Sequence, residues 1–183
     1  MLELQTKKTR FATTNIALIG IFSALWVALN LTVAPLGFTL THLPTIHSAI
    51  IFVMLLLVTW TTGQYGAASL VGTIGSVIVV LAGGALPVLG FVPAAIIFDL
   101  ILLLSHHKVN LKPINVGIAV LACIICAYVA AVVNGLVILN LQLIFTLTVW
   151  AGWNILGAII GFAIAFPIIA ALEKAEVRKV KAE

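Results

Sequence analysis

Apolar residues of this chain are gathered into six long runs, which shorter and more polar connections separate. The runs cover about residues 11–33, 44–60, 65–82, 88–105, 114–139 and 146–172. A helix needs about 20 apolar residues to cross about 30 Å of hydrocarbon, and each run is near that length. The pattern predicts an all-α integral membrane protein, a compact bundle of six transmembrane helices that forms a single domain over residues 1–183.

The composition agrees with this pattern, because 63% of the 183 residues are hydrophobic and only 8% are charged. A soluble domain needs far more charge on its surface. A secreted protein with one signal peptide is also excluded, because apolar runs recur to the C-terminus. Cys123 and Cys126 lie inside an apolar run, so neither a disulfide scaffold nor a metal or redox site is expected.

Positive charge is confined to three places: the N-terminus, the connection between the fourth and fifth runs, and the C-terminus. The residues are Lys7, Lys8, Arg10, Lys108, Lys112, Lys174, Arg178, Lys179 and Lys181. Six crossings place these regions on one side, and the positive-inside rule makes that side the cytoplasm. Both termini are therefore predicted to be cytoplasmic. The first outer connection, about residues 34–43, is apolar and is expected to fold back over the bundle.

Small residues form a stripe along the first run, where Ala17, Gly20, Ala24 and Ala28 fall within a narrow arc of a helix. Small side chains let two helix backbones approach closely, so the stripe predicts a docking face. It can pack inside the bundle or against a partner subunit. Asn30 points well away from it.

Polar and aromatic side chains gather in the predicted outer half of the bundle. They are Asn30, His47, Asn134, Trp150, Trp153 and Asn154, with His42 in the loop above them. Amides, imidazoles and indoles from several helices at one depth indicate a small-ligand pocket that opens outward. Alternatively, they bond one another or backbone carbonyls, since an unpaired polar group in hydrocarbon is costly. An interfacial aromatic belt is a further explanation for Trp150.

Asp99 is the one acidic residue inside a predicted membrane segment. A carboxylate there is expensive and should face the bundle interior. A packing anchor bonded to nearby hydroxyls is favoured over a protonated acid or a coupling-ion site. His106 and His107 follow in a basic loop and are expected to be solvated.

No catalytic residues are expected, since the chain has no HExxH, GxSxG or GxxxxGK[ST] motif. It is therefore not predicted to be an enzyme, and any energy for transport must come from a partner or an ion gradient.

Six helices in fewer than 200 residues, the small-residue stripe and the glycine-rich third run Gly66-Ala-Ala-Ser-Leu-Val-Gly-Thr-Ile-Gly75 resemble the substrate-binding S components of energy-coupling factor (ECF) vitamin transporters. The resemblance covers essentially the whole chain and is one of pattern. It implies that Gly20, Ala24 and Ala28 dock on a transmembrane coupling subunit, with a glycine in place of the first alanine. It also implies two separate ATPase subunits, the plasma membrane of a prokaryote, and a vitamin site near the outer face under the first outer loop.

Charge narrows the expected substrate, because ligands with carboxylates are usually held by Arg or Lys and the outer half has neither. A neutral or cationic heterocycle fits better, with thiamine or its pyrimidine precursor first and riboflavin or a queuosine precursor next. Cobalt or nickel is disfavoured, since His42 and His47 are a poor ligand set. No cofactor and no nucleic-acid partner is expected; lipid surrounds the bundle. The alternatives are a non-transporting scaffold or assembly subunit and an autonomous secondary carrier.

Overall fold

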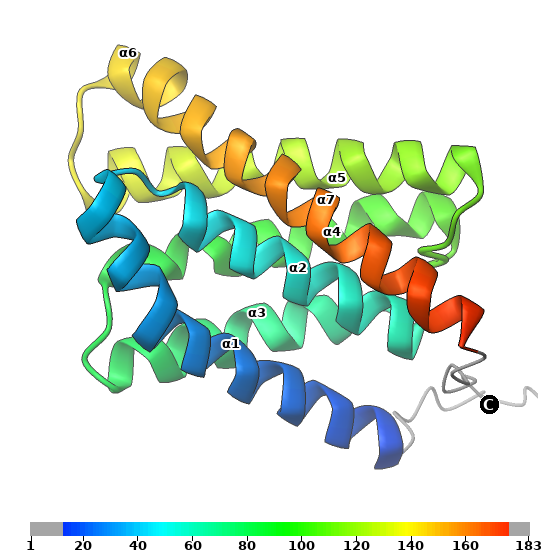
Figure 1. Cartoon of the computed structure of the whole chain (residues 1–183). Coiled ribbons are helices and arrows are strands. Elements are labelled where there is room, and N and C mark those ends of the chain that lie inside the picture. The colour runs from blue at the N-terminus through cyan, green and yellow to red at the C-terminus, as the bar shows by residue number, and fades with distance from the viewer. Residues whose placement is uncertain (1–12, 176–183) are drawn as a thin grey trace, which may run out of the picture.

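The computed structural model describes residues 13–175, and this part of the chain is helical without strands (Figure 1). Its elements are α1 (Thr13–Thr41), α2 (Thr45–Thr62), α3 (Ala67–Leu81), η1 (Leu86–Gly90), α4 (Phe91–Leu102), η2 (Leu103–Ser105), α5 (Pro113–Val132), η3 (Val133–Ile138), α6 (Leu143–Phe145), η4 (Thr146–Trp150) and α7 (Ala151–Lys174). Elements that follow each other directly join into six helical segments within residues 13–175. The predicted all-α class is confirmed.

The six segments lie side by side along the bundle (Figure 1). The first residues of α1 and the last residues of α7 lie at the right of the view, which we call the terminal end. The α1–α2, α3–η1 and η3–α6 connections lie at the opposite end, the distal end. The η2–α5 connection, which contains Lys108 and Lys112, also lies at the terminal end, and Lys174 is the last residue of α7. Lys7, Lys8, Arg10, Arg178, Lys179 and Lys181 lie outside the described residues.

Five of the described segments are long and apolar enough to cross a membrane, and they indicate a multi-pass membrane protein. The exception is α3, which has 15 residues. Glycines limit it at both ends: Gly66 precedes it with a φ of 89°, and Gly83 follows it with a φ of 85°. Backbone angles in this region favour glycine, so the chain leaves the helix at these points.

The first predicted connection is wrong, because α1 continues through Pro35 and ends at Thr41. Apolar residues followed by threonines are compatible with either a loop or a helix. Thr39 and Thr41 donate hydrogen bonds from their hydroxyls to the carbonyls of Leu36 and Gly37, at 2.9 and 2.8 Å. The helix ends where His42 takes a φ of 55°. The bounds of the other five segments agree with the prediction within a few residues.

The helix α2 lies at the centre of the bundle, where it contacts α1, α3 and α7. Its residues 51–56 are all buried. A Cβ atom at Gly157 or Gly161 would overlap the α2 backbone at Thr45 or Ala49. The two helices therefore approach each other closely, as small residues allow in membrane bundles.

The helix α1 packs on α2 and α3 through a face that includes Trp26, whose fully buried ring lies against Gly75. The small-residue stripe is on another side. Ala17, Gly20, Ala24 and Ala28 are all exposed, and no described atom lies within 4 Å of a Cβ built at Gly20. Of the two packings that the sequence left open, the one inside the bundle is wrong.

Candidate ligand-binding cavity

A cavity of about 580 Å³ lies at the distal end of the bundle. Its walls come from α1, α2, the end of α3, η1 with the connection before it, and the η3-to-α7 hairpin. The lining residues are Asn30, Leu31, Ala34, Pro35, Phe38, Thr39, Pro44, His47, Val79, Gly83, Gly84, Ala85, Pro87, Asn134, Leu139, Trp150 and Asn154. Small-molecule sites typically measure about 300–1,000 Å³ and are mostly apolar with a few polar groups. This cavity has the size and lining of such a site.

Five of the seven residues that the sequence singled out line this cavity. They are Asn30 on α1, His47 on α2, Asn134 on η3, Trp150 on η4 and Asn154 on α7. They are far apart in the sequence, and the bundle brings them together because each lies near the distal end of its segment.

The other two predicted residues, His42 and Trp153, do not line the cavity. His42 is exposed beyond α1, and its ring meets that of Phe38 edge-on, with centroids 6.3 Å apart. Trp153 is partly buried. It precedes Asn154 by one residue, which is about 100° around a helix, so the two side chains leave α7 in different directions.

Two π-helical turns, η3 and η4, shape one wall of the cavity. Asn134 lies on η3, and Gly90 of η1 leaves room for it, because a Cβ at position 90 would overlap the Asn134 amide. Gly135 similarly faces Thr146 on η4. Such π turns are rare in proteins, but those that occur are often found at functional sites. No sequence pattern marks the π turns, so they were not foreseen, although Asn134 and Trp150 on them were predicted to bind substrate.

Sequence reasoning also missed the apolar wall that Pro35, Phe38 and Leu139 contribute. Pro35 and Phe38 lie on the part of α1 that was expected to be a loop over the bundle. The expected cover is present, but it consists of helix. Leu139 directly follows η3.

The Asn154 amide is held by two hydrogen bonds. The buried Ser48 hydroxyl on α2 donates to Asn154 Oδ1 at 2.7 Å, and Asn154 Nδ2 donates to the Trp150 carbonyl at 2.9 Å. Asn30 Nδ2 similarly donates to the Trp26 carbonyl at 2.9 Å. The alternative prediction was that these polar groups bond each other or the backbone. It holds for the bonded atoms of the two amides, which are Oδ1 and Nδ2 of Asn154 and Nδ2 of Asn30.

Other polar atoms of the lining residues have no partner. They are Asn30 Oδ1, His47 Nε2, Asn134 Oδ1 and Trp150 Nε1, and all are buried. Leaving one such group unpaired costs about 1–3 kcal/mol. Buried polar groups are usually satisfied, so these four atoms are exceptions within the cavity wall. Among the lining side chains of residues 13–175, none carries a full charge at neutral pH.

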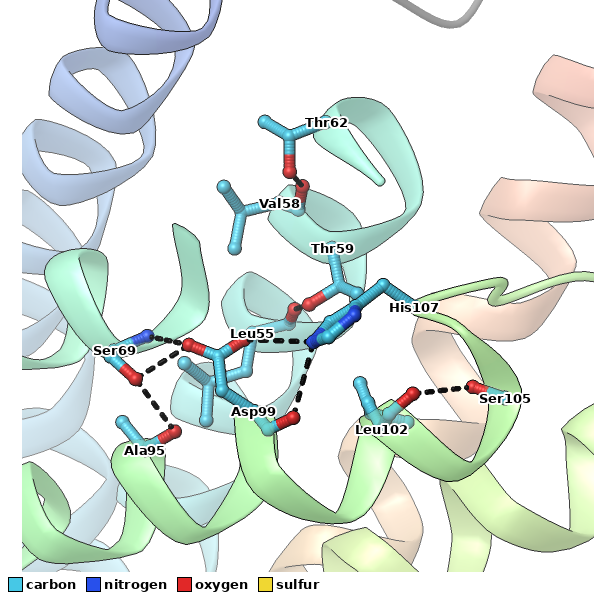
Figure 2. A network of polar contacts seen from close by, with 10 residues as sticks. All are labelled: Leu55, Val58, Thr59, Thr62, Ser69, Ala95, Asp99, Leu102, Ser105 and His107. Atoms are coloured by element: carbon cyan, nitrogen blue, oxygen red, sulfur yellow. Dashed lines mark hydrogen bonds and ion pairs between the residues drawn. The ribbon is translucent and has the colours of Figure 1, made fainter. Parts of the chain in front are cut away.

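Asp99 lies apart from this cavity, in a polar cluster toward the terminal end (Figure 2). Its buried carboxylate accepts hydrogen bonds at Oδ2 from the Ser69 backbone N–H at 2.7 Å and from the Ser69 hydroxyl at 2.5 Å. Ser69 lies in the first turn of α3, which has no side-chain cap of its own. Asp99 therefore caps the N-terminus of a neighbouring helix, where a negative charge is favourable.

His107 joins the same cluster and is buried, so the expectation that it is solvated is wrong. Its Nε2 lies 3.1 Å from the Asp99 carbonyl and 3.9 Å from Asp99 Oδ1 (Figure 2). A carbonyl only accepts, so this nitrogen carries a proton. The backbone of His106 and His107 is left-handed, with φ of 50° and 55°, and it turns His107 back onto α4 while His106 stays exposed. These contacts are those of the favoured packing anchor.

No protein-family model, curated protein or solved structure matches this chain. The fold and the cavity are therefore the observations on which a function can rest. They describe a multi-pass helical membrane protein with an uncharged, ligand-sized cavity at one end.

Proposed function

We propose that this chain is the substrate-binding membrane subunit of an ECF-type importer. It captures a small heterocyclic vitamin or precursor in the distal cavity and delivers it inward together with a separate coupling subunit and two ATPase subunits. One observation carries the proposal: five residues predicted from sequence to bind substrate line a single cavity of about 580 Å³. The family resemblance supplies the transport context.

The distal end faces the outside and both termini face the cytoplasm of a prokaryotic cell in this proposal. Its support is the distribution of lysines, because Lys108, Lys112 and Lys174 lie at the terminal end. Basic residues in short connections are retained on the cytoplasmic side. The cavity then faces the medium from which the substrate is taken.

Impermeant thiol labelling tests this orientation. A cysteine at Thr41 should be labelled from outside intact cells, whereas one at Leu111 should react only after lysis. Both positions are exposed, and the native Cys123 and Cys126 are buried and should give little background. Labelling of Leu111→Cys alone in intact cells would reverse the orientation.

A heterocyclic substrate follows from the groups around the cavity. Trp150 offers an aromatic face for stacking, and the three asparagines and His47 offer hydrogen bonds. The lining has no arginine or lysine in the described chain, which disfavours ligands with a carboxylate or phosphate. The pyrimidine precursor of thiamine or thiamine itself comes first, followed by riboflavin or a queuosine precursor.

Alanine variants test the cavity. Trp150→Ala should remove the stacking face and Asn154→Ala a polar contact, each weakening the substrate by about 1–3 kcal/mol, or roughly one to two decades in affinity. Trp153→Ala is the matched control, because it removes an indole from α7 outside the lining. Isothermal titration of purified variants with the vitamin found by a thermal-shift screen measures the effect. Unchanged affinity in both cavity variants would misplace the site.

Two other functions compete with this one. A scaffold or assembly subunit would bind protein partners through its small-residue face and would not need an uncharged cavity with unpaired polar groups. An autonomous secondary carrier is the weaker alternative, because Asp99 is the one buried carboxylate in the described residues and its hydrogen bonds to Ser69 are those of a packing anchor. Uptake by proteoliposomes that contain this chain alone would establish the carrier.

A further inference from the structure

The wall of the cavity formed by η4 and α7 offers a hydrogen-bond donor. Asn154 Oδ1 is occupied by the Ser48 hydroxyl, and one Nδ2 hydrogen is used by the Trp150 carbonyl. The polar hydrogen left to Asn154 is the second one on Nδ2. Asn154 lines the cavity, so this wall offers a hydrogen-bond donor at Asn154 Nδ2.

The other two lining asparagines have no accessible oxygen to offer. Asn30 Nδ2 donates to the Trp26 carbonyl, and Oδ1 of both Asn30 and Asn134 is buried. The Asn134 amide packs against Gly90, because a Cβ atom at position 90 would overlap its Oδ1. Asn154 is therefore the lining amide whose polarity toward a ligand can be assigned.

We infer that the substrate is an uncharged heterocycle that presents a hydrogen-bond acceptor to Asn154, and that Ser48 fixes this polarity by orienting Asn154. The inference rests on the proposed function and narrows its substrate class. A ring nitrogen or a ring carbonyl supplies such an acceptor. A cation such as thiamine finds no counter-charge among the described lining residues, so its uncharged precursor is favoured over thiamine itself.

Ser48 acts here as a positioning residue. It is fully buried and does not line the cavity, so its contribution to substrate binding passes through Asn154. Without the Ser48 hydroxyl, the Asn154 amide can turn and present its oxygen, which repels a ligand acceptor.

Pairs of related compounds, one uncharged and one charged, test whether the substrate is uncharged. The purified full chain is titrated with 4-amino-5-hydroxymethyl-2-methylpyrimidine against thiamine, with riboflavin against flavin mononucleotide, and with 7-cyano-7-deazaguanine against its charged 7-aminomethyl counterpart. In the pair that binds, the uncharged member should bind at least about tenfold tighter. Equal or tighter binding of the charged member overturns the inference and leaves the proposed function standing. If no probe binds at millimolar concentration, the proposed function fails and the inference fails with it.

Variants test the polarity on the probe that binds. Asn154→Asp replaces donors by acceptors and should weaken it by about 10–100-fold, and Ser48→Ala should weaken it by about 3–10-fold. Ser76→Ala is the control, because Ser76 is another buried serine, donates to the Val88 carbonyl at 3.1 Å and lies outside the lining. If Asn154→Asp does not fold, Ser48→Ala alone still decides.

The double variant separates positioning from a general structural effect. In an Asn154→Ala background, Ser48→Ala should cause no further loss of affinity, because its target is gone. A further loss of the same size as in the wild-type background would overturn the positioning role. Wild-type affinity in both Ser48→Ala and Asn154→Asp would overturn the assigned polarity.

Discussion

Replacing Ala28 with tryptophan should abolish vitamin uptake in cells while the purified protein stays folded and binds its ligand. Ala28 is exposed and shares its stripe with Gly20 and Ala24, away from the face of α1 that packs on the bundle. A bulky side chain there has space in the isolated protein, but it prevents the close backbone approach that a docking helix needs. Uptake in cells that supply the coupling and ATPase subunits should fall by about tenfold or more, to the level without this chain.

Val33→Trp is the matched control for this variant. Val33 is exposed on the same helix, does not line the cavity and lies about 140° around the helix from Ala28. A tryptophan there remains in contact with lipid, so uptake should continue. Full uptake with Ala28→Trp would contradict the docking proposal, whatever the effect of this substitution on stability.

Removing the Asp99 carboxylate should cause the largest loss of stability. Asp99→Ala leaves the Ser69 N–H without its acceptor and the Ser69 hydroxyl with only a long contact to the Ala95 carbonyl, whereas His107 Nε2 keeps its bond to the backbone carbonyl of residue 99. Leaving a buried donor unsatisfied typically costs about 1–3 kcal/mol, and more where the lost acceptor is charged. Unfolding of the purified protein in mixed micelles of increasing denaturing detergent measures the change in free energy.

The stabilities of two histidine variants are compared to test the polar cluster around Asp99. His107→Gln should lower stability, whereas His106→Gln should have little effect, because His106 is exposed and has a similar left-handed backbone. Wild-type stability of Asp99→Ala would show that the cluster is not an anchor. The coupling-ion role would then become the better explanation of this buried acid.

The number and approximate bounds of the helices could be predicted because each apolar run matches the thickness of a bilayer. The position of a residue along its helix was predictable for the same reason, because residues near the same end of neighbouring helices lie at the same level of the bundle. This is why Asn30, Asn134 and Asn154 were brought together correctly. The sequence did not reveal the end of α1, since its last turns are apolar residues and threonines that suit a helix or a loop.

The direction in which a side chain leaves its helix was much less predictable than its position along the helix. Trp150 and Trp153 are equivalent by composition, but Trp150 ends a π turn and lines the cavity, whereas Trp153 does not. The burial of His107 depends on a left-handed backbone in a loop that reads as basic and solvated. These details arise from tertiary packing, which local patterns do not record.

The burial of α2 limits which amino-acid substitutions this protein can accept during evolution. None of the residues of α2 is fully exposed, and only a narrow face that includes Ile46, Ile50, Leu57 and Thr61 is partly exposed, so most of this helix is enclosed by protein. Lipid accepts apolar side chains of any shape, but an enclosed position must conserve volume. In descendants of this protein, substitutions should recur with a helical period along α1, where buried and exposed residues alternate every few positions. Along α2 they should be rare at most positions.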